Sequence, residues 1–112
     1  MPEFDIQPTS ESTLTLAVTG RIDSMTVTMF RDAMQQAIKQ ARNIILNLSG
    51  VEYMSSAGLR EIVNGFKALQ QKQGEICIVQ PTERVFEVIN MAGLDTLLSV
   101  YDSMEEATKR FE

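Results

Sequence analysis

The stretch Asn43-Ile44-Ile45-Leu46-Asn47-Leu48 decides the fold of this 112-residue chain. It is nearly continuously apolar, and two of its residues are β-branched. Such a run is typical of a strand that is covered on both faces, as strands in the interior of a parallel sheet are. We therefore expect a central parallel strand with helices packed against the sheet.

The segments on either side of this strand alternate between the period of a strand and the period of a helix. Residues 13–19 have a period of two, and residues 4–8 predict a short first strand joined to them by a hairpin. Apolar residues three and four positions apart between Val27 and Ala41 indicate one face of a helix, which Ser24 or Thr26 can cap. Downstream the same periods predict a helix over 59–69, a strand over 76–79, a helix over 85–89, a strand over 97–101 and a helix after Ser103.

The element order is strand-strand-helix-strand-helix-strand-helix-strand-helix. Strands that alternate with helices imply parallel pairs joined by right-handed crossovers. The sequence thus predicts one α/β domain over residues 1–112, a mixed and mostly parallel sheet of four to five strands with about four helices. We expect a loop over residues 49–55, and we expect Gly74 to be the C′ residue that ends the second helix.

The residue counts exclude several kinds of site. The chain has no histidine and one cysteine, so it cannot build a Ser-His-Asp or Cys-His catalytic set or a structural zinc site. We predict no metal and no cofactor. A lone cysteine forms no internal disulfide, which fits a reducing compartment, and we interpret Cys77 as a small buried apolar residue.

Charge and hydropathy exclude two classes of partner. The net charge is −5 and the sequence pI is about 4.7, which argues against nucleic acid as a partner. No apolar run approaches the roughly 20 residues of a membrane span, and the first residues do not resemble a signal peptide. We therefore expect a cytoplasmic protein with no membrane partner, and an acidic chain of this size is expected to be a monomer.

The corner between the central strand and the second helix contains two adjacent serines, Ser55 and Ser56. Their simplest role is to cap the helix through a hydroxyl group. A nucleophile elbow is excluded because the first glycine of that motif and a histidine base are both missing. A phosphate-binding loop is excluded because no Gly-Lys-Ser/Thr ending is present. The remaining hypothesis is a serine that is itself phosphorylated, since a helix N-terminus stabilises negative charge.

A second candidate segment, residues 20–23, leads from the second strand into the first helix. Gly20 fits a turn, and Asp23 fits the start of a helix, where the dipole favours a carboxylate. If the second strand is the neighbour of the central strand, this segment lies beside the two serines. The two loops then form one surface.

Three motifs in the chain resemble the STAS domain, the domain of sulfate transporters and anti-sigma factor antagonists. They are TGRID at residues 19–23, LNLSGVEYMSSAGL at residues 46–59 and MAGL at residues 91–94. The resemblance extends from about residue 4 to residue 111. It is strongest to the free-standing anti-sigma factor antagonists.

This resemblance implies a regulatory module of a bacterial partner-switching system rather than an enzyme. The unphosphorylated form would bind an anti-sigma factor that is also a serine-protein kinase. Phosphorylation would disrupt that binding, and a serine phosphatase would reset the switch. The family's acceptor aligns with Ser56, with Ser55 as a minor alternative. Ser55 stands where the family usually has an acidic residue, and Ala57 stands where it usually has Ser or Thr.

The predicted partner face follows from the same alignment and from charge. A phosphate adds roughly −1.5 to −2 charges, and in an interface it must be desolvated or repelled, which weakens binding. The residues that we predict to bind the partner are Asp23, Met54, Ser55, Ser56, Gly58 and Leu59.

Two other classes of function remain open. The chain can be an unphosphorylated STAS scaffold in a larger signalling or transport assembly. It can also bind a small ligand, such as a nucleotide or a lipid, at the same loop corner. An enzyme is the least favoured class, because no paired catalytic constellation is present in the sequence.

Overall fold

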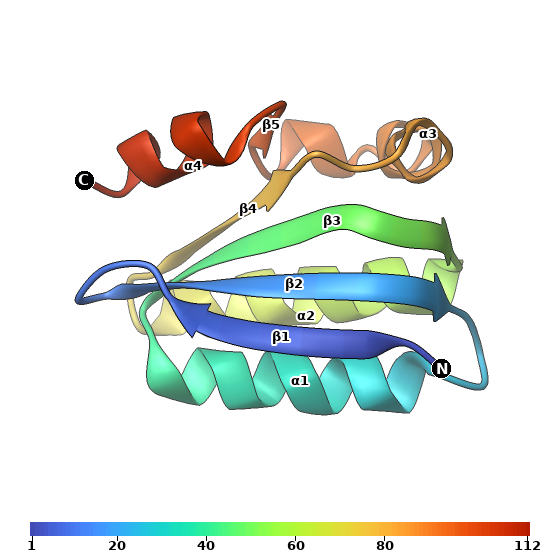
Figure 1. The fold of residues 1–112 in the computed structure, drawn as a ribbon, viewed down its shortest axis with the longest axis horizontal. Helices are drawn as coiled ribbons and strands as arrows, with labels where there is room; N and C mark the ends of the chain where they lie inside the picture. Colours follow the sequence, from blue (N-terminus) through green and yellow to red (C-terminus); the bar gives the residue numbers. More distant parts are fainter.

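The computed structural model describes all 112 residues as a five-stranded sheet with four α-helices. Figure 1 shows the sheet with its strands side by side in chain order, β1 to β5. The β1–β2 pair is antiparallel and the other three pairs are parallel. This confirms the predicted α/β fold class and element order. The elements are β1 (Glu3–Pro8), β2 (Thr13–Ile22), α1 (Val27–Gln40), β3 (Asn43–Met54), α2 (Ser56–Gln71), β4 (Glu75–Val79), α3 (Glu83–Met91), the 3₁₀ helix η1 (Leu94–Thr96), β5 (Val100–Tyr101) and α4 (Met104–Arg110).

The main core lies between one face of the sheet and the helices α1, α2 and α3. Side chains at alternate positions of β2, β3 and β4 point into it, because successive residues of a strand face opposite sides. α1 and α2 lie along this face (Figure 1). The apolar strand residues of this core are Leu14, Leu16, Val18, Ile22, Ile44, Leu46, Leu48, Val51, Met54, Ile76 and Ile78. No helix is both long enough and apolar enough to cross a membrane.

The opposite face of the sheet is covered only in part. A small cluster of Ile45, Cys77, Val79 and Ala107 packs α4 against β3 and β4. Burial raises the pKa of the Cys77 thiol to about 12, so the reactive thiolate is not formed near neutral pH. This placement confirms that Cys77 is a buried apolar residue.

β2 and β3 are longer than the apolar pattern predicts. The expected loop over residues 49–55 is wrong for residues 49–54, which continue β3 to Met54. Two register shifts extend the pairing, one between Ala17 and Thr19 and one between Gly20 and Arg21. Gly50 makes this pairing possible, since a Cβ there would lie 2.6 Å from Cγ2 of Thr19. Bulges of this kind keep a strand paired through residues that look like a loop. At the other edge the expected strand over 97–101 is short, because η1 precedes it and β5 begins only at Val100.

The end of α2 differs from the prediction in one residue. Gln73, with φ of 62°, takes the left-handed C′ position, and Gly74 follows it. The N–H of Gln73 donates to the carbonyl of Gln70 at 3.0 Å, and the N–H of Gly74 donates to that of Leu69 at 2.7 Å. These two bonds define a Schellman motif. Gly74 is needed for space instead, because a Cβ there would lie 1.8 Å from the carbonyl oxygen of Arg42.

Substitutions of Gly74 and Gln73 should change the free energy of unfolding in opposite directions. Gly74→Ala places a methyl group against the rigid backbone of Arg42, so we expect a loss of about 3 kcal/mol in the free energy of unfolding. Gln73→Gly relieves a left-handed conformation and should raise that free energy by about 1 kcal/mol. Urea unfolding of the two variants and the wild type measures both. A Gly74→Ala variant as stable as the wild type would contradict this assignment.

Candidate phosphorylation and partner-binding site

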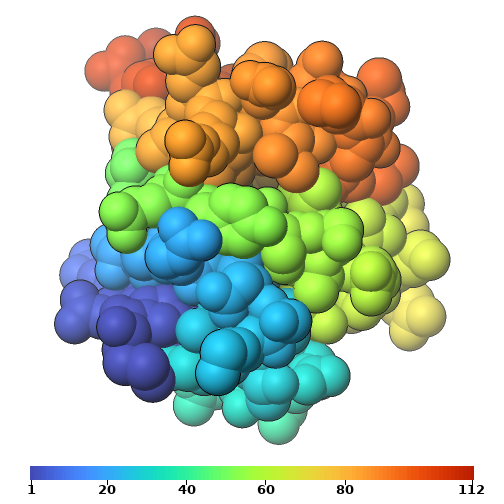
Figure 2. Space-filling view, turned by 90° about the vertical axis from the view of Figure 1, so that its right-hand side faces the viewer, coloured from blue at the N-terminus to red at the C-terminus, as the bar shows by residue number.

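Three connections meet where β2, β3 and β4 end, at one edge of the sheet. In the β2–β3 register Ile22 lies opposite Met54, and the N–H of Ser55 donates to the carbonyl of Ile22 at 2.8 Å. The Thr82 hydroxyl at the start of α3 donates to the carbonyl of Val51 at 3.1 Å. Figure 2 shows this side, where the blue, green and orange segments form one continuous surface. The prediction that residues 20–23 lie beside the two serines is therefore confirmed.

Ser55 is the N-cap residue of α2. Its backbone is extended, with φ of −80° and ψ of 171°, and its hydroxyl oxygen accepts from the N–H of Gly58 at 3.4 Å. The side chain is half-buried. The capping interpretation of the serine pair is thus confirmed for Ser55, whose hydroxyl satisfies one of the free N–H groups of the first turn.

Ser56 is the first residue of the helix, and its side chain is exposed. The first turn of α2 contains no acidic residue. Its N–H groups have no acceptor within the helix, and the helix dipole places partial positive charge there. This position can therefore accommodate a negatively charged group without loss of the helix.

Asp23 is held in a hydrogen-bonded turn before α1. Its Oδ1 accepts from the N–H of Met25 at 3.0 Å and from the N–H of Thr26 at 3.2 Å. Thr26 occupies the N-cap position, but its side chain makes no cap bond. Its hydroxyl instead donates to the carbonyl of Arg21 at 2.8 Å and accepts from the N–H of Asp23 at 2.9 Å. The turn is therefore fixed by its own side chains.

Three of the six residues predicted to bind the partner lie beneath the surface. Met54 is 1% exposed and Leu59 is 6% exposed, and both belong to the main core. A Cβ at Gly58 would lie 2.7 Å from Cγ of Met54 and 2.9 Å from Cγ2 of Ile22. These residues pack the first turn of α2 onto the ends of β2 and β3 and cannot themselves contact a partner. The accessible part of the predicted set is Asp23, Ser55 and Ser56.

Two features of this edge were not found from the sequence. Met25 lies in the turn after Asp23 and is 90% exposed. The only signal in the sequence is that Met25 precedes the first residue of the helical period, Val27. The guanidinium of Arg21 lies 4.7 Å from the ring centre of Tyr53, a cation–π contact. The two residues are opposite each other in the β2–β3 register. This pairing could not be predicted from the sequence, because it depends on the bulges in β2 and β3.

The loop corner itself contains no deep cavity. None of the five principal cavities is lined by Ser55 or Ser56. One cavity of about 310 Å³ reaches Asp23 from the side of Gly20 and Glu52. No group of three or more histidine, cysteine or carboxylate side chains is placed to hold a metal ion. A surface without an enclosing cavity fits a macromolecular contact better than a small ligand.

Comparison with known proteins identifies a domain family that matches most of the chain. A family model described as the STAS domain matches residues 6–107. The chain is 31% identical over 101 residues to the anti-sigma F factor antagonist of Paenibacillus polymyxa. The aligned region covers 88% of this chain and 86% of that protein.

Solved structures show the same fold. An anti-sigma factor antagonist from Mycobacterium paratuberculosis has a TM-score of 0.89 at 20% identity, covering 98% of this chain and 93% of that one. The anti-sigma factor antagonist SpoIIAA in its unphosphorylated form has a TM-score of 0.83 at 22% identity, covering 97% and 96%. The Bacillus cell fate determinant SpoIIAA in the phosphorylated form has a TM-score of 0.76 at 21% identity, covering 98% and 100%.

The two serines should differ in their effect on stability. Ser55→Ala removes the cap of α2 and should lower the free energy of unfolding by about 1 kcal/mol. Ser56→Ala removes an exposed hydroxyl and should change it by less than about 0.5 kcal/mol. Thermal and urea unfolding of both variants compares the two roles, and equal losses would contradict the assignment of Ser55 as the cap.

Two glycines of α2 give a matched test of the packing beneath Ser56. At Gly58 a methyl group would meet Cγ of Met54 and Cγ2 of Ile22, atoms close to their backbones. At Gly65 it would meet the terminal methyl group of Met34, 2.3 Å away, which is the flexible end of that side chain. Gly58→Ala should therefore lower the free energy of unfolding by about 2 kcal/mol. Gly65→Ala should lower it less, because Ala also favours a helix by about 1 kcal/mol. A larger loss for Gly65→Ala would contradict the close packing at Gly58.

Proposed function

This chain belongs to the STAS domain family, and on that basis we propose that it is an anti-sigma factor antagonist of a bacterial partner-switching system. Its unphosphorylated form binds an anti-sigma factor that is also a serine-protein kinase. Phosphorylation on Ser56 disrupts this complex, and a serine phosphatase restores it. In the cell it acts as a cytoplasmic monomer.

The observation that carries this proposal is the different environment of the two serines. Ser56 is exposed at the first position of α2, so a kinase can reach its hydroxyl. Ser55 is half-buried, and its hydroxyl oxygen already accepts the N–H of Gly58. This supports Ser56 as the acceptor. The relative SpoIIAA, whose phosphorylated form has been solved, has the same fold.

A phosphate on Ser56 changes the surface without unfolding the domain. The N-terminus of α2 stabilises the added charge of roughly −1.5 to −2. A partner that contacts this corner must remove water from the phosphate and place its own groups against it. A few kcal/mol lost in this way lowers the affinity by orders of magnitude.

In this proposal, the partner enzymes catalyse the phosphorylation and dephosphorylation of Ser56. The chain has no histidine, and an unactivated serine hydroxyl is a weak nucleophile without an adjacent base. We therefore assign Ser56 the role of a substrate, phosphorylated by a kinase that supplies the base, the nucleotide and the metal ion. The alternative, an unphosphorylated STAS scaffold in a larger signalling or transport assembly, makes a different prediction for the same variants.

Binding to the kinase should depend on the charge at position 56. Ser56→Ala should bind the anti-sigma factor kinase like the wild type and should stay bound in the presence of ATP. Ser56→Glu should bind at least tenfold more weakly, which corresponds to about 1.4 kcal/mol. Pulldown of the kinase from the cells of origin, followed by titration of the purified pair, measures both affinities.

A neighbouring substitution provides the control for this experiment. Arg60→Glu adds negative charge to an exposed position one turn further along α2 without touching the acceptor. If Ser56→Glu and Arg60→Glu weaken binding equally, general charge repulsion explains the effect. If Ser56→Glu binds like the wild type, the scaffold alternative is favoured over the switch.

A further inference from the structure

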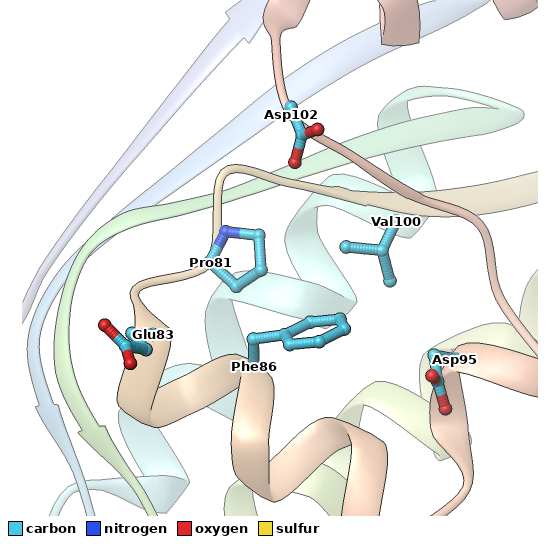
Figure 3. Close-up of a pocket in the computed structure, with 6 residues that line it drawn as sticks. All are labelled: Pro81, Glu83, Phe86, Asp95, Val100 and Asp102. Carbon is cyan, nitrogen blue, oxygen red and sulfur yellow. The ribbon is translucent and has the colours of Figure 1, made fainter.

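A cavity of about 560 Å³ lies at the other end of this edge, between α3, η1 and the connection from β5 to α4. It is separate from the two serines and was not anticipated from the sequence. Figure 3 shows its six lining residues, which come from α3, η1, β5 and the connections before α3 and after β5. They are Pro81, Glu83, Phe86, Asp95, Val100 and Asp102.

The floor of the cavity is apolar. In Figure 3 the ring of Phe86 lies between Pro81 and Asp95, and Val100 lies above it. Phe86 is 39% exposed, although its neighbours on α3, Val85 and Ile89, are fully buried in the core. α3 therefore has one side in the core and places an aromatic ring on the surface, where it offers an unoccupied face to a ligand.

The rim of the cavity is acidic and lacks partner cations. Glu83, Asp95 and Asp102 come from α3, η1 and the β5–α4 connection. The structure contains two ion pairs, Lys109–Glu105 and Arg110–Glu75, and neither includes a carboxylate of the rim. These three carboxylates are not close enough together to hold a metal ion. The arrangement fits a larger cation that reaches several carboxylates at once.

A motif identified in the sequence builds one side of this rim. Residues 91–94 lead from the last residue of α3 to the first residue of η1, and Gly93 reverses the chain with φ of 76°. Leu94 is 6% exposed and anchors η1 in the core, so Asp95 is presented to the cavity. Its Oδ2 accepts from the side-chain amide of Asn90 at 2.8 Å, which holds the carboxylate in place. The Asp95 side of the rim is therefore preorganised.

We propose that this cavity binds an arginine side chain from a segment of a partner protein. A guanidinium is planar and weakly hydrated, stacks on an aromatic face, and has five N–H donors that can reach carboxylates in different directions. The aliphatic stem of arginine covers Val100 and Pro81. Lysine matches less well, because its compact, strongly hydrated ammonium favours a single close acceptor. An anionic ligand such as a nucleotide is repelled by the rim.

The cavity is placed so that one partner can contact it together with the serine corner. The Thr82 hydroxyl connects the first turn of α3 to the carbonyl of Val51 in β3, and Glu83 and Phe86 follow directly on that turn. Figure 2 shows the α3 segment adjoining the end of β3 on this side. Arginine binding nevertheless requires only the cavity and does not depend on phosphorylation of Ser56.

An NMR titration with three matched peptides tests the proposal. The probe is the peptide acetyl-Gly-Arg-Leu-Gly-amide. In its two counterparts the arginine is replaced by citrulline, which has the shape of arginine without the charge, or by lysine. The arginine peptide should shift the backbone amide signals of residues around Phe86, Asp95 and Asp102 of the ¹⁵N-labelled protein in a saturable manner. The citrulline peptide and the lysine peptide should bind at least about fivefold more weakly. Equal binding of either would overturn the assignment of an arginine site.

Variants on one helix localise the binding. Glu83→Gln and Phe86→Ala should each weaken binding of the arginine peptide at least about threefold, whereas Glu87→Gln should leave it unchanged. Glu87 is exposed on the same helix and does not line the cavity. The spectrum of each free variant reports whether its fold is intact, and Asp102→Asn replaces any variant that is not folded. No saturable shift at the cavity, or equal effects of Glu83→Gln and Glu87→Gln, would contradict the proposal.

Discussion

The close contact between the first turn of α2 and the ends of β2 and β3 is the constraint on which the site depends. Gly58 has no side chain because Met54 and Ile22 occupy the space that a Cβ would need. The N–H of Ser55 completes the contact by donating to the carbonyl of Ile22. These interactions fix the start of the helix relative to the sheet, so that Ser55 points inward as the cap and Ser56 points outward. A modification at Ser56 therefore acts on a rigid surface.

The fold class follows from the sequence because apolar periodicity is a local signal. The strand at residues 43–48 and the helices on either side of it are identified by their own side chains. The extension of β3 to Met54 could not be predicted in the same way. Ser49, Gly50 and Glu52 look like a loop, and only their pairing with β2, about thirty residues earlier in the chain, makes them a strand. Sequence propensity gives way to tertiary pairing at such positions.

The structure places the predicted site residues at one corner of the sheet, but it buries half of them. The motif around Ser56 suggested that Met54 and Leu59 belong to the partner surface, whereas both lie in the core. Burial depends on how α2 crosses the sheet, which neighbours in the chain do not reveal. Met25 and the cavity beside Phe86 were missed for the same reason. The cavity is formed by five segments between residues 81 and 102 that meet only in the folded chain.

The structure provides a rigid helix start and an exposed hydroxyl group on Ser56. In the proposed switch, a kinase and a phosphatase carry out the reactions on that hydroxyl. The most direct measurement is the mass-spectrometric localisation of phosphate on protein that has been incubated with its anti-sigma factor kinase and ATP. The account predicts one phosphate, on Ser56, with Ser55 unmodified. An unmodified chain, or a phosphate on any other residue, would contradict it.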